Sequence, residues 1–137
     1  DVYRNYLKYM NLPADKEIIH GEIADYCLDD GILISDSKPV QRTVENIAAN
    51  VALVKQITGN KRIPLLIFLK RSPVPDKETR KFSAAQVPQI YSAMAMVSKP
   101  GLSMLVMKMV FQLKKPPIPT RSFTSEAEAR NWLRQFV

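Results

Sequence analysis

The sequence predicts an α/β domain: a mixed, mostly parallel sheet with an antiparallel β-hairpin at one edge and helices packed on it. Two observations carry this prediction. A tight-turn signal, Asp29-Asp30-Gly31, lies between two apolar segments near the N-terminus. After it, apolar residues at helical spacing alternate with short apolar runs typical of buried strands. At 137 residues, we expect one domain over residues 1–137.

The hairpin is predicted over residues 17–36. Residues 17–28 read as a strand, and 32–36 as the return strand after the turn. Residues 1–16 are predicted to be a helical extension, because tyrosines and aliphatic residues recur there at helical spacing and Pro13 ends the pattern.

Three helix–strand units and a last helix are predicted to follow the hairpin. Thr43, Asp76 and Ser125 each stand where a helix N-cap belongs, and Gly59 stands at a C-cap position. The expected order is a helix to residue 57, a strand over 63–69, a helix to about 86, a strand over 90–97, a helix over about 100–113, a strand over 120–123 and a helix after Ser125.

The net charge of +7 is distributed unevenly along the chain. Residues 1–60 carry six basic and nine acidic side chains, whereas residues 61–137 carry fourteen and four. A basic half can attract nucleic acid, anionic lipid or an acidic protein, and it also suits a merely solvated surface. No aromatic-interleaved strand or recognition helix accompanies the charge, so we do not expect nucleic-acid binding.

No catalytic, metal-binding or cofactor-binding residues are expected. Cys27 is the only cysteine and His20 the only histidine, too few for a zinc site or a nucleophile–base pair. Asp29 and Asp30 are explained by the turn, and the four glycines form no phosphate-binding loop. The lone cysteine and the charged start favour a cytoplasmic location. The sequence therefore predicts a protein that is not an enzyme.

Three stretches resemble the STAS domain, the fold of the SpoIIAA-like anti-sigma-factor antagonists, and in particular its small bacterial members of unassigned function. They are residues 28–33 at the hairpin, 61–67 at the strand after Gly59, and 114–129 at the last strand and capped helix. The resemblance implies a STAS-like sandwich that binds proteins, or sometimes small ligands, without catalysis. It also offers Ser72 as a candidate phosphorylation site, although the Asp and Gly of the family signature are missing and Pro73 follows.

The helix predicted over about 100–113 is apolar around nearly its whole circumference. One face of this helix must pack on the sheet, and the apolar side chains on its other faces then need a second contact surface. Other segments, a second copy of the chain, or an apolar ligand or membrane could each cover them. The candidate interaction residues are Met104, Met107, Lys108, Val110 and Phe111.

Two functions remain open from these features. The first is a regulatory module that binds a protein partner, or a second copy of itself, through this helix. The alternative is a carrier or sensor of lipid or another apolar ligand, because a related SpoIIAA-like branch resembles the CRAL-TRIO lipid-transfer fold. Lysines beside the helix suit an anionic membrane surface and equally suit solvation.

Overall fold

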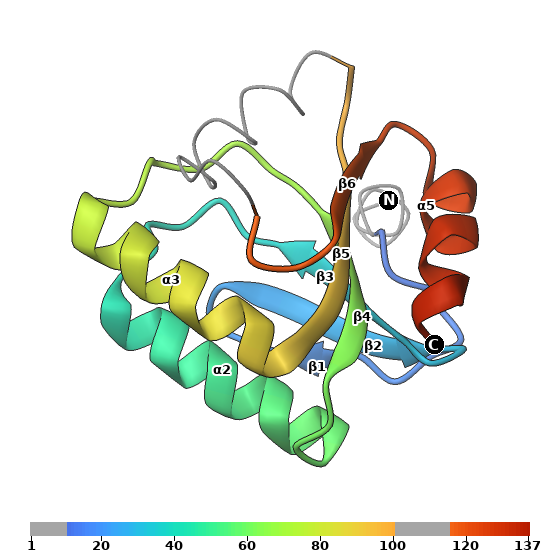
Figure 1. Ribbon diagram of the computed structural model, residues 1–137, viewed down its shortest axis with the longest axis horizontal. Coiled ribbons are helices and arrows are strands. Elements are labelled where there is room, and N and C mark those ends of the chain that lie inside the picture. The colour runs from blue at the N-terminus through green and yellow to red at the C-terminus, as the bar shows by residue number, and fades with distance from the viewer. Residues whose placement is uncertain (1–10, 101–115) are drawn as a thin grey trace, which may run out of the picture.

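The computed structural model describes residues 11–100 and 116–137. Within them, six strands form one sheet in the order β1-β2-β3-β4-β5-β6 (Figure 1). The strands are β1 (Ile19–His20), β2 (Ala24–Asp29), β3 (Ile32–Ser37), β4 (Ile63–Phe68), β5 (Tyr91–Val97) and β6 (Thr120–Phe123). The helices are α2 (Val44–Thr58), α3 (Lys77–Ile90) and α5 (Glu126–Leu133), followed by the 3-10 turn η1 (Arg134–Phe136).

The sheet is mixed and its parallel part is the larger. Strands β1, β2 and β3 pair antiparallel, and β3, β4, β5 and β6 pair parallel. Helices α2 and α3 lie side by side on one face, and α5 covers the other (Figure 1). The predicted fold class, a mostly parallel sheet with the hairpin at one edge, is confirmed.

The prediction of one strand over residues 17–28 is wrong, because the chain reverses at Gly21 to make β1 and β2. The Gly21 N–H donates to the Ala24 carbonyl at 3.0 Å, which closes the reversal. A Cβ at Gly21 would lie 2.6 Å from that oxygen, so the turn needs glycine. His20 therefore lies opposite Asp25 on the neighbouring strand.

The second reversal agrees with the prediction. Asp30 and Gly31 have φ values of 51° and 78°, the positive values that a two-residue hairpin loop requires. Asp29 pairs with Ile32 directly across this loop.

The helix boundaries follow the capping residues. The Thr43 hydroxyl accepts from the Asn46 N–H at 3.1 Å, and the Asn46 side-chain oxygen accepts from the Thr43 N–H at 2.8 Å. Helix α3 extends to Ile90, beyond its expected end near residue 86. Pro88 removes one N–H from its last turn, yet the Tyr91 N–H still donates to the Val87 carbonyl, so the helix continues through the proline.

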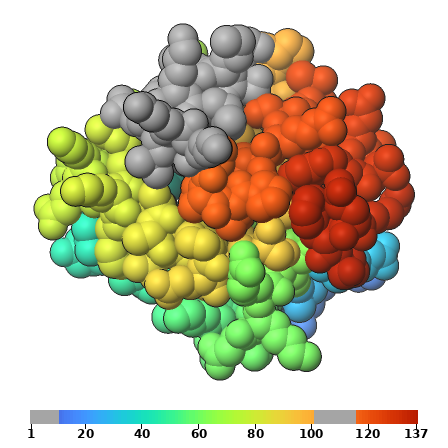
Figure 2. Space-filling view, viewed as in Figure 1, coloured from blue at the N-terminus to red at the C-terminus, as the bar shows by residue number. Residues whose placement is uncertain are grey.

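Two apolar cores form, one on each face of the sheet. Alternation along β4 sends Leu65 toward α2 and α3 and Leu66 toward α5. Cys27 is fully buried in the α5 core, as expected for a lone cysteine. In Figure 2, α3 (yellow) and the C-terminal segment from residue 116 (orange to red) cover much of the face seen.

Two predicted helices fall wholly or mostly outside the described residues. They are the helix over about 100–113 and the N-terminal extension, of which only residues 11–16 are described. Those six residues form turns and bends. In the part of the chain that is described, no helix has the length and apolarity needed to cross a membrane.

Candidate functional site

A cavity of about 240 Å³ lies between the sheet and helices α2 and α3. We call it the α2–α3 cavity. Its walls come from β2, β3, β4 and β5, from the inner sides of both helices, and from the loop over residues 69–75. Aliphatic side chains such as Val51, Leu65 and Val87 make up much of the lining. Natural interiors seldom leave voids much larger than a water molecule, so a space of this size is unusual. It is slightly smaller than the roughly 300–1,000 Å³ of drug-sized ligand sites, which limits an occupant to a small molecule.

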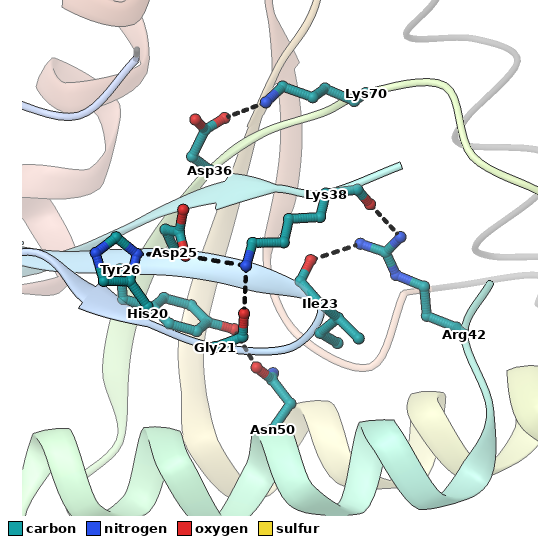
Figure 3. A network of polar contacts seen from close by, with 10 residues as sticks. All are labelled: His20, Gly21, Ile23, Asp25, Tyr26, Asp36, Lys38, Arg42, Asn50 and Lys70. Carbon is teal, nitrogen blue, oxygen red and sulfur yellow. Dashed lines mark hydrogen bonds and ion pairs between the residues drawn. The ribbon is translucent and has the colours of Figure 1, made fainter. Parts of the chain in front are cut away.

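A small polar cluster marks one wall of the cavity. The Tyr26 hydroxyl, carried by β2, donates to the Asn50 side-chain oxygen on α2 at 2.7 Å (Figure 3). Tyr91 and Ser35 lie beside it and also line the cavity. The site thus combines an apolar body with a few positioned hydrogen-bonding groups, which is typical of small-molecule sites.

Burial changes the acidity of the two tyrosines in this cluster. It raises the pKa of Tyr26, against the opposing effect of the Asn50 hydrogen bond. Burial also raises the pKa of Tyr91 well above its ordinary value, and the neighbouring Tyr26 raises it further. Both phenols are therefore neutral at physiological pH and can donate or accept a hydrogen bond.

The raised tyrosine pKa values predict a loss of stability at alkaline pH. The folded state holds these protons more tightly than the unfolded state does. Their contribution is thus complete below about pH 10, where unfolded tyrosine titrates, and declines as pH rises above it. Between the pKa of unfolded tyrosine and the higher pKa of the folded state, each tyrosine is expected to lower the free energy of unfolding by about 1.4 kcal/mol per pH unit. Urea unfolding from pH 8 to 11 should show a shallower decline for Tyr91→Phe than for the unmodified protein. Equal declines would contradict the assignment.

Arg42 lies where the chain enters α2, and it also lines the cavity. Its guanidinium donates to the carbonyls of Lys38 (2.5 Å), Val40 (2.8 Å) and Ile23 (3.1 Å), and to the Ser37 hydroxyl (2.7 Å). Figure 3 shows the bonds to Lys38 and Ile23. All four acceptors are neutral. Burial lowers the pKa of Arg42, but arginine stays charged at physiological pH.

The acidic residues near the hairpin have structural partners instead. Asp25 contacts Lys38 at 3.3 Å and His20 at 3.1 Å, and the Lys38 ammonium donates to the Gly21 carbonyl (Figure 3). Asp29 contacts Arg130 of α5 at 2.9 Å. Within residues 11–100 and 116–137, no three His, Cys, Asp or Glu side chains are grouped so that they could hold a metal ion.

The structure places one predicted site residue at this cavity. Ser72 lies in the loop after β4 and lines the cavity. The candidate interaction residues Met104, Met107, Lys108, Val110 and Phe111 lie outside the described residues.

Sequence reasoning did not identify Tyr26, Asn50 or Arg42 as site residues. Tyr26 falls within residues 17–28, which the sequence predicts only as a strand. The available signal was Asn50, a polar residue close to the apolar face of an otherwise aliphatic helix.

The comparisons with known proteins agree with this architecture. A family model described as a domain of unknown function (DUF7793) matches residues 26–137. An uncharacterised protein of the DUF3478 family from Shewanella loihica PV-4, solved as a crystal structure and described as having a SpoIIAA-like fold, aligns with a TM-score of 0.52. The alignment has 14% identity and covers 90% of this chain and 98% of that chain. No curated protein matches. The likeness shows a SpoIIAA-like fold, as the sequence resemblance predicted.

Proposed function

We propose that this chain, which belongs to the DUF7793 family of domains of unknown function, binds a small apolar molecule in the α2–α3 cavity as a non-catalytic carrier or sensor. The observation that carries the proposal is the cavity itself, about 240 Å³ of space with an aliphatic lining and a few hydrogen-bonding groups. Of the two functions left open by the sequence, this is the one that the described residues support.

The position of the cavity adds to the support. In open sheets with parallel strands, ligands bind in the crevice beyond the carboxyl ends of the strands. The cavity lining includes the loop over residues 69–75, which leaves the carboxyl end of β4, and Ser37 at the carboxyl end of β3. A ligand here would touch both helices and the sheet. Its binding would therefore tie these elements together, which is what a sensor requires.

Protein binding through the helix over about 100–113 stays a prediction. The regulatory role that it would serve is compatible with a ligand-binding cavity, because a bound molecule can change which surface is presented to a partner.

Octan-1-ol, a neutral probe with eight carbons, tests the proposal on the full chain. We expect saturable binding, with stabilisation against urea of about 2.7 kcal/mol when the free probe reaches 100 times its Kd. In two-dimensional amide NMR, the largest shifts should fall on cavity residues such as Val51 and Ala84. Amides of the opposite core, such as Ala95 and Ala129, are the internal control.

Two results would count against binding in the cavity. One is the absence of saturation up to the solubility of octan-1-ol. The other is a set of shifts centred on the α5 core rather than on the α2–α3 cavity.

A further inference from the structure

Among the residues that the structure describes, the charged ones that line the α2–α3 cavity are all basic. Arg42, Lys70, Arg71 and Arg80 contribute to its described lining, and no Asp or Glu does. They do not surround the cavity evenly. Arg42 precedes α2, Lys70 and Arg71 follow β4, and Arg80 lies in the first turn of α3. The four therefore come from the edge where β3 and β4 end and α2 and α3 begin.

Two of these charges lack a carboxylate partner among the described residues. These two are Arg42 and Arg71. Lys70, in contrast, has a carboxylate partner, because it contacts Asp36 at 3.3 Å (Figure 3). Arg42 donates only to three carbonyls and a hydroxyl, so its charge is solvated by the protein but not neutralised. Arg71 is exposed and forms no ion pair with any described residue.

Both helices begin at the same edge, and each already has carboxylates at its start: Glu45 in the first turn of α2, and Asp76 and Glu78 at the start of α3. α2 and α3 are 15 and 14 residues long, and both begin there. The N-terminus of a helix carries about half a positive charge, which favours a nearby anion. The carboxylates at the two helix starts offset this effect, so the positive charge available to a ligand comes from the partly buried Arg42 guanidinium and from the exposed Arg71.

Apart from the cluster of Tyr26, Asn50 and Tyr91, the rest of the cavity lining is mostly aliphatic. Val51, Val87 and Ile90 contribute to it from the later turns of α2 and α3, and Leu65 and Met94 contribute from the sheet. The cavity thus combines a basic edge with a mostly aliphatic body that contains one neutral polar cluster. Its volume of about 240 Å³ equals roughly eight water molecules in the liquid, and so accommodates about eight to ten non-hydrogen atoms.

From this polarity we propose that the ligand is a small amphiphilic anion of the size of a medium-chain carboxylate, with its negative group at Arg42 and Arg71 and its hydrocarbon body between α2, α3 and the sheet. The inference rests on the proposed function and specifies the chemistry of the molecule bound.

Octanoate and octanamide form the matched pair of probes, because they have the same shape and chain length and differ in charge. At pH 7.5 octanoate is ionised. Calorimetric titration of the full chain should give a Kd about ten-fold lower for octanoate than for octanamide. Raising the salt concentration from 50 to 500 mM should weaken octanoate binding and leave octanamide binding unchanged, because only the charged probe is screened.

Arg71→Gln provides the variant, since Arg71 makes no polar contact with a described residue that folding would need. Arg42 is less suitable because its guanidinium satisfies four acceptors. We expect Arg71→Gln to weaken octanoate binding several-fold and to leave octanamide binding unchanged. Arg134→Gln is the matched control, because it removes the same charge from an exposed position after α5 that does not line the cavity.

The outcomes separate the two proposals. If octanamide binds as tightly as octanoate and Arg71→Gln alters neither, the anionic ligand is wrong while binding in the cavity stands. If octanoate, octanamide and octan-1-ol all fail to bind, the proposed function itself is wrong, and the anionic ligand with it.

Discussion

Replacing Ala84 with tryptophan is expected to abolish the binding of octan-1-ol and octanoate while leaving the protein folded. Ala84 lies on α3 and lines the α2–α3 cavity, where an indole would occupy much of the space that a ligand needs. Because the added ring fills an apolar void, the free energy of unfolding should be unchanged or higher. Calorimetric titration measures the binding, and urea unfolding of the same samples measures the stability. The expected loss is at least a hundred-fold in affinity.

The neighbouring residue gives a matched control. Ala85 is exposed on the same helix and does not line the cavity, so Ala85→Trp adds the same side chain at nearly the same sequence position. We expect it to bind both probes as the unmodified protein does. Equal affinities for Ala84→Trp, Ala85→Trp and the unmodified protein would place the ligand elsewhere on the molecule.

Replacing Leu33 with alanine is expected to lower the free energy of unfolding by about 2–5 kcal/mol. Leu33 lies on β3, has 0% of its surface exposed, and packs in the core shared by the sheet and α2. Removal of its side-chain atoms forfeits their burial and leaves a hole that the sheet cannot close, because β3 pairs with a strand on each side. Urea unfolding measures the change through the transition midpoint at constant slope.

The same substitution can be made at the residue paired with Leu33. Leu28 lies directly opposite it on β2 but has 43% of its surface exposed. We expect Leu28→Ala to cost less than about 1 kcal/mol, since much of that side chain already meets water. If Leu33→Ala and Leu28→Ala lower the free energy of unfolding by the same amount, the burial of Leu33 in the core is wrong.

Local chemistry explains why the fold was predictable from the sequence. Caps and turns depend on a few adjacent residues, so Thr43, Ser125 and the Asp29-Asp30-Gly31 turn reveal their positions without reference to the rest of the chain. The short apolar runs at β4 and β5 indicate strands buried on both faces, and the chain between them is long enough for a helical crossover. Together these signals predicted a mostly parallel sheet with its hairpin at one edge.

The reversal between β1 and β2 shows where local signals are too weak. Residues 17–28 keep an apolar pattern through the turn, and the only mark of a reversal is Gly21. A single glycine in a strand pattern is also consistent with a bulge, so the sequence did not distinguish the two. The hydrogen bond from the Gly21 N–H to the Ala24 carbonyl, at 3.0 Å, shows that the chain reverses here, and it is visible only in the tertiary structure.

By itself, therefore, the sequence determined the class of fold, the order of the described elements from β2 onward, the burial of Cys27 and the basic character of the second half of the chain. Only the tertiary structure decided that Tyr26, Asn50, Arg42 and the loop over residues 69–75 surround one cavity. The reason is physical: propensities and caps act between neighbours in the chain, whereas a cavity is the space left between side chains from different elements. Which side chains share that space depends on strand order and helix placement, and neither is encoded in any one segment.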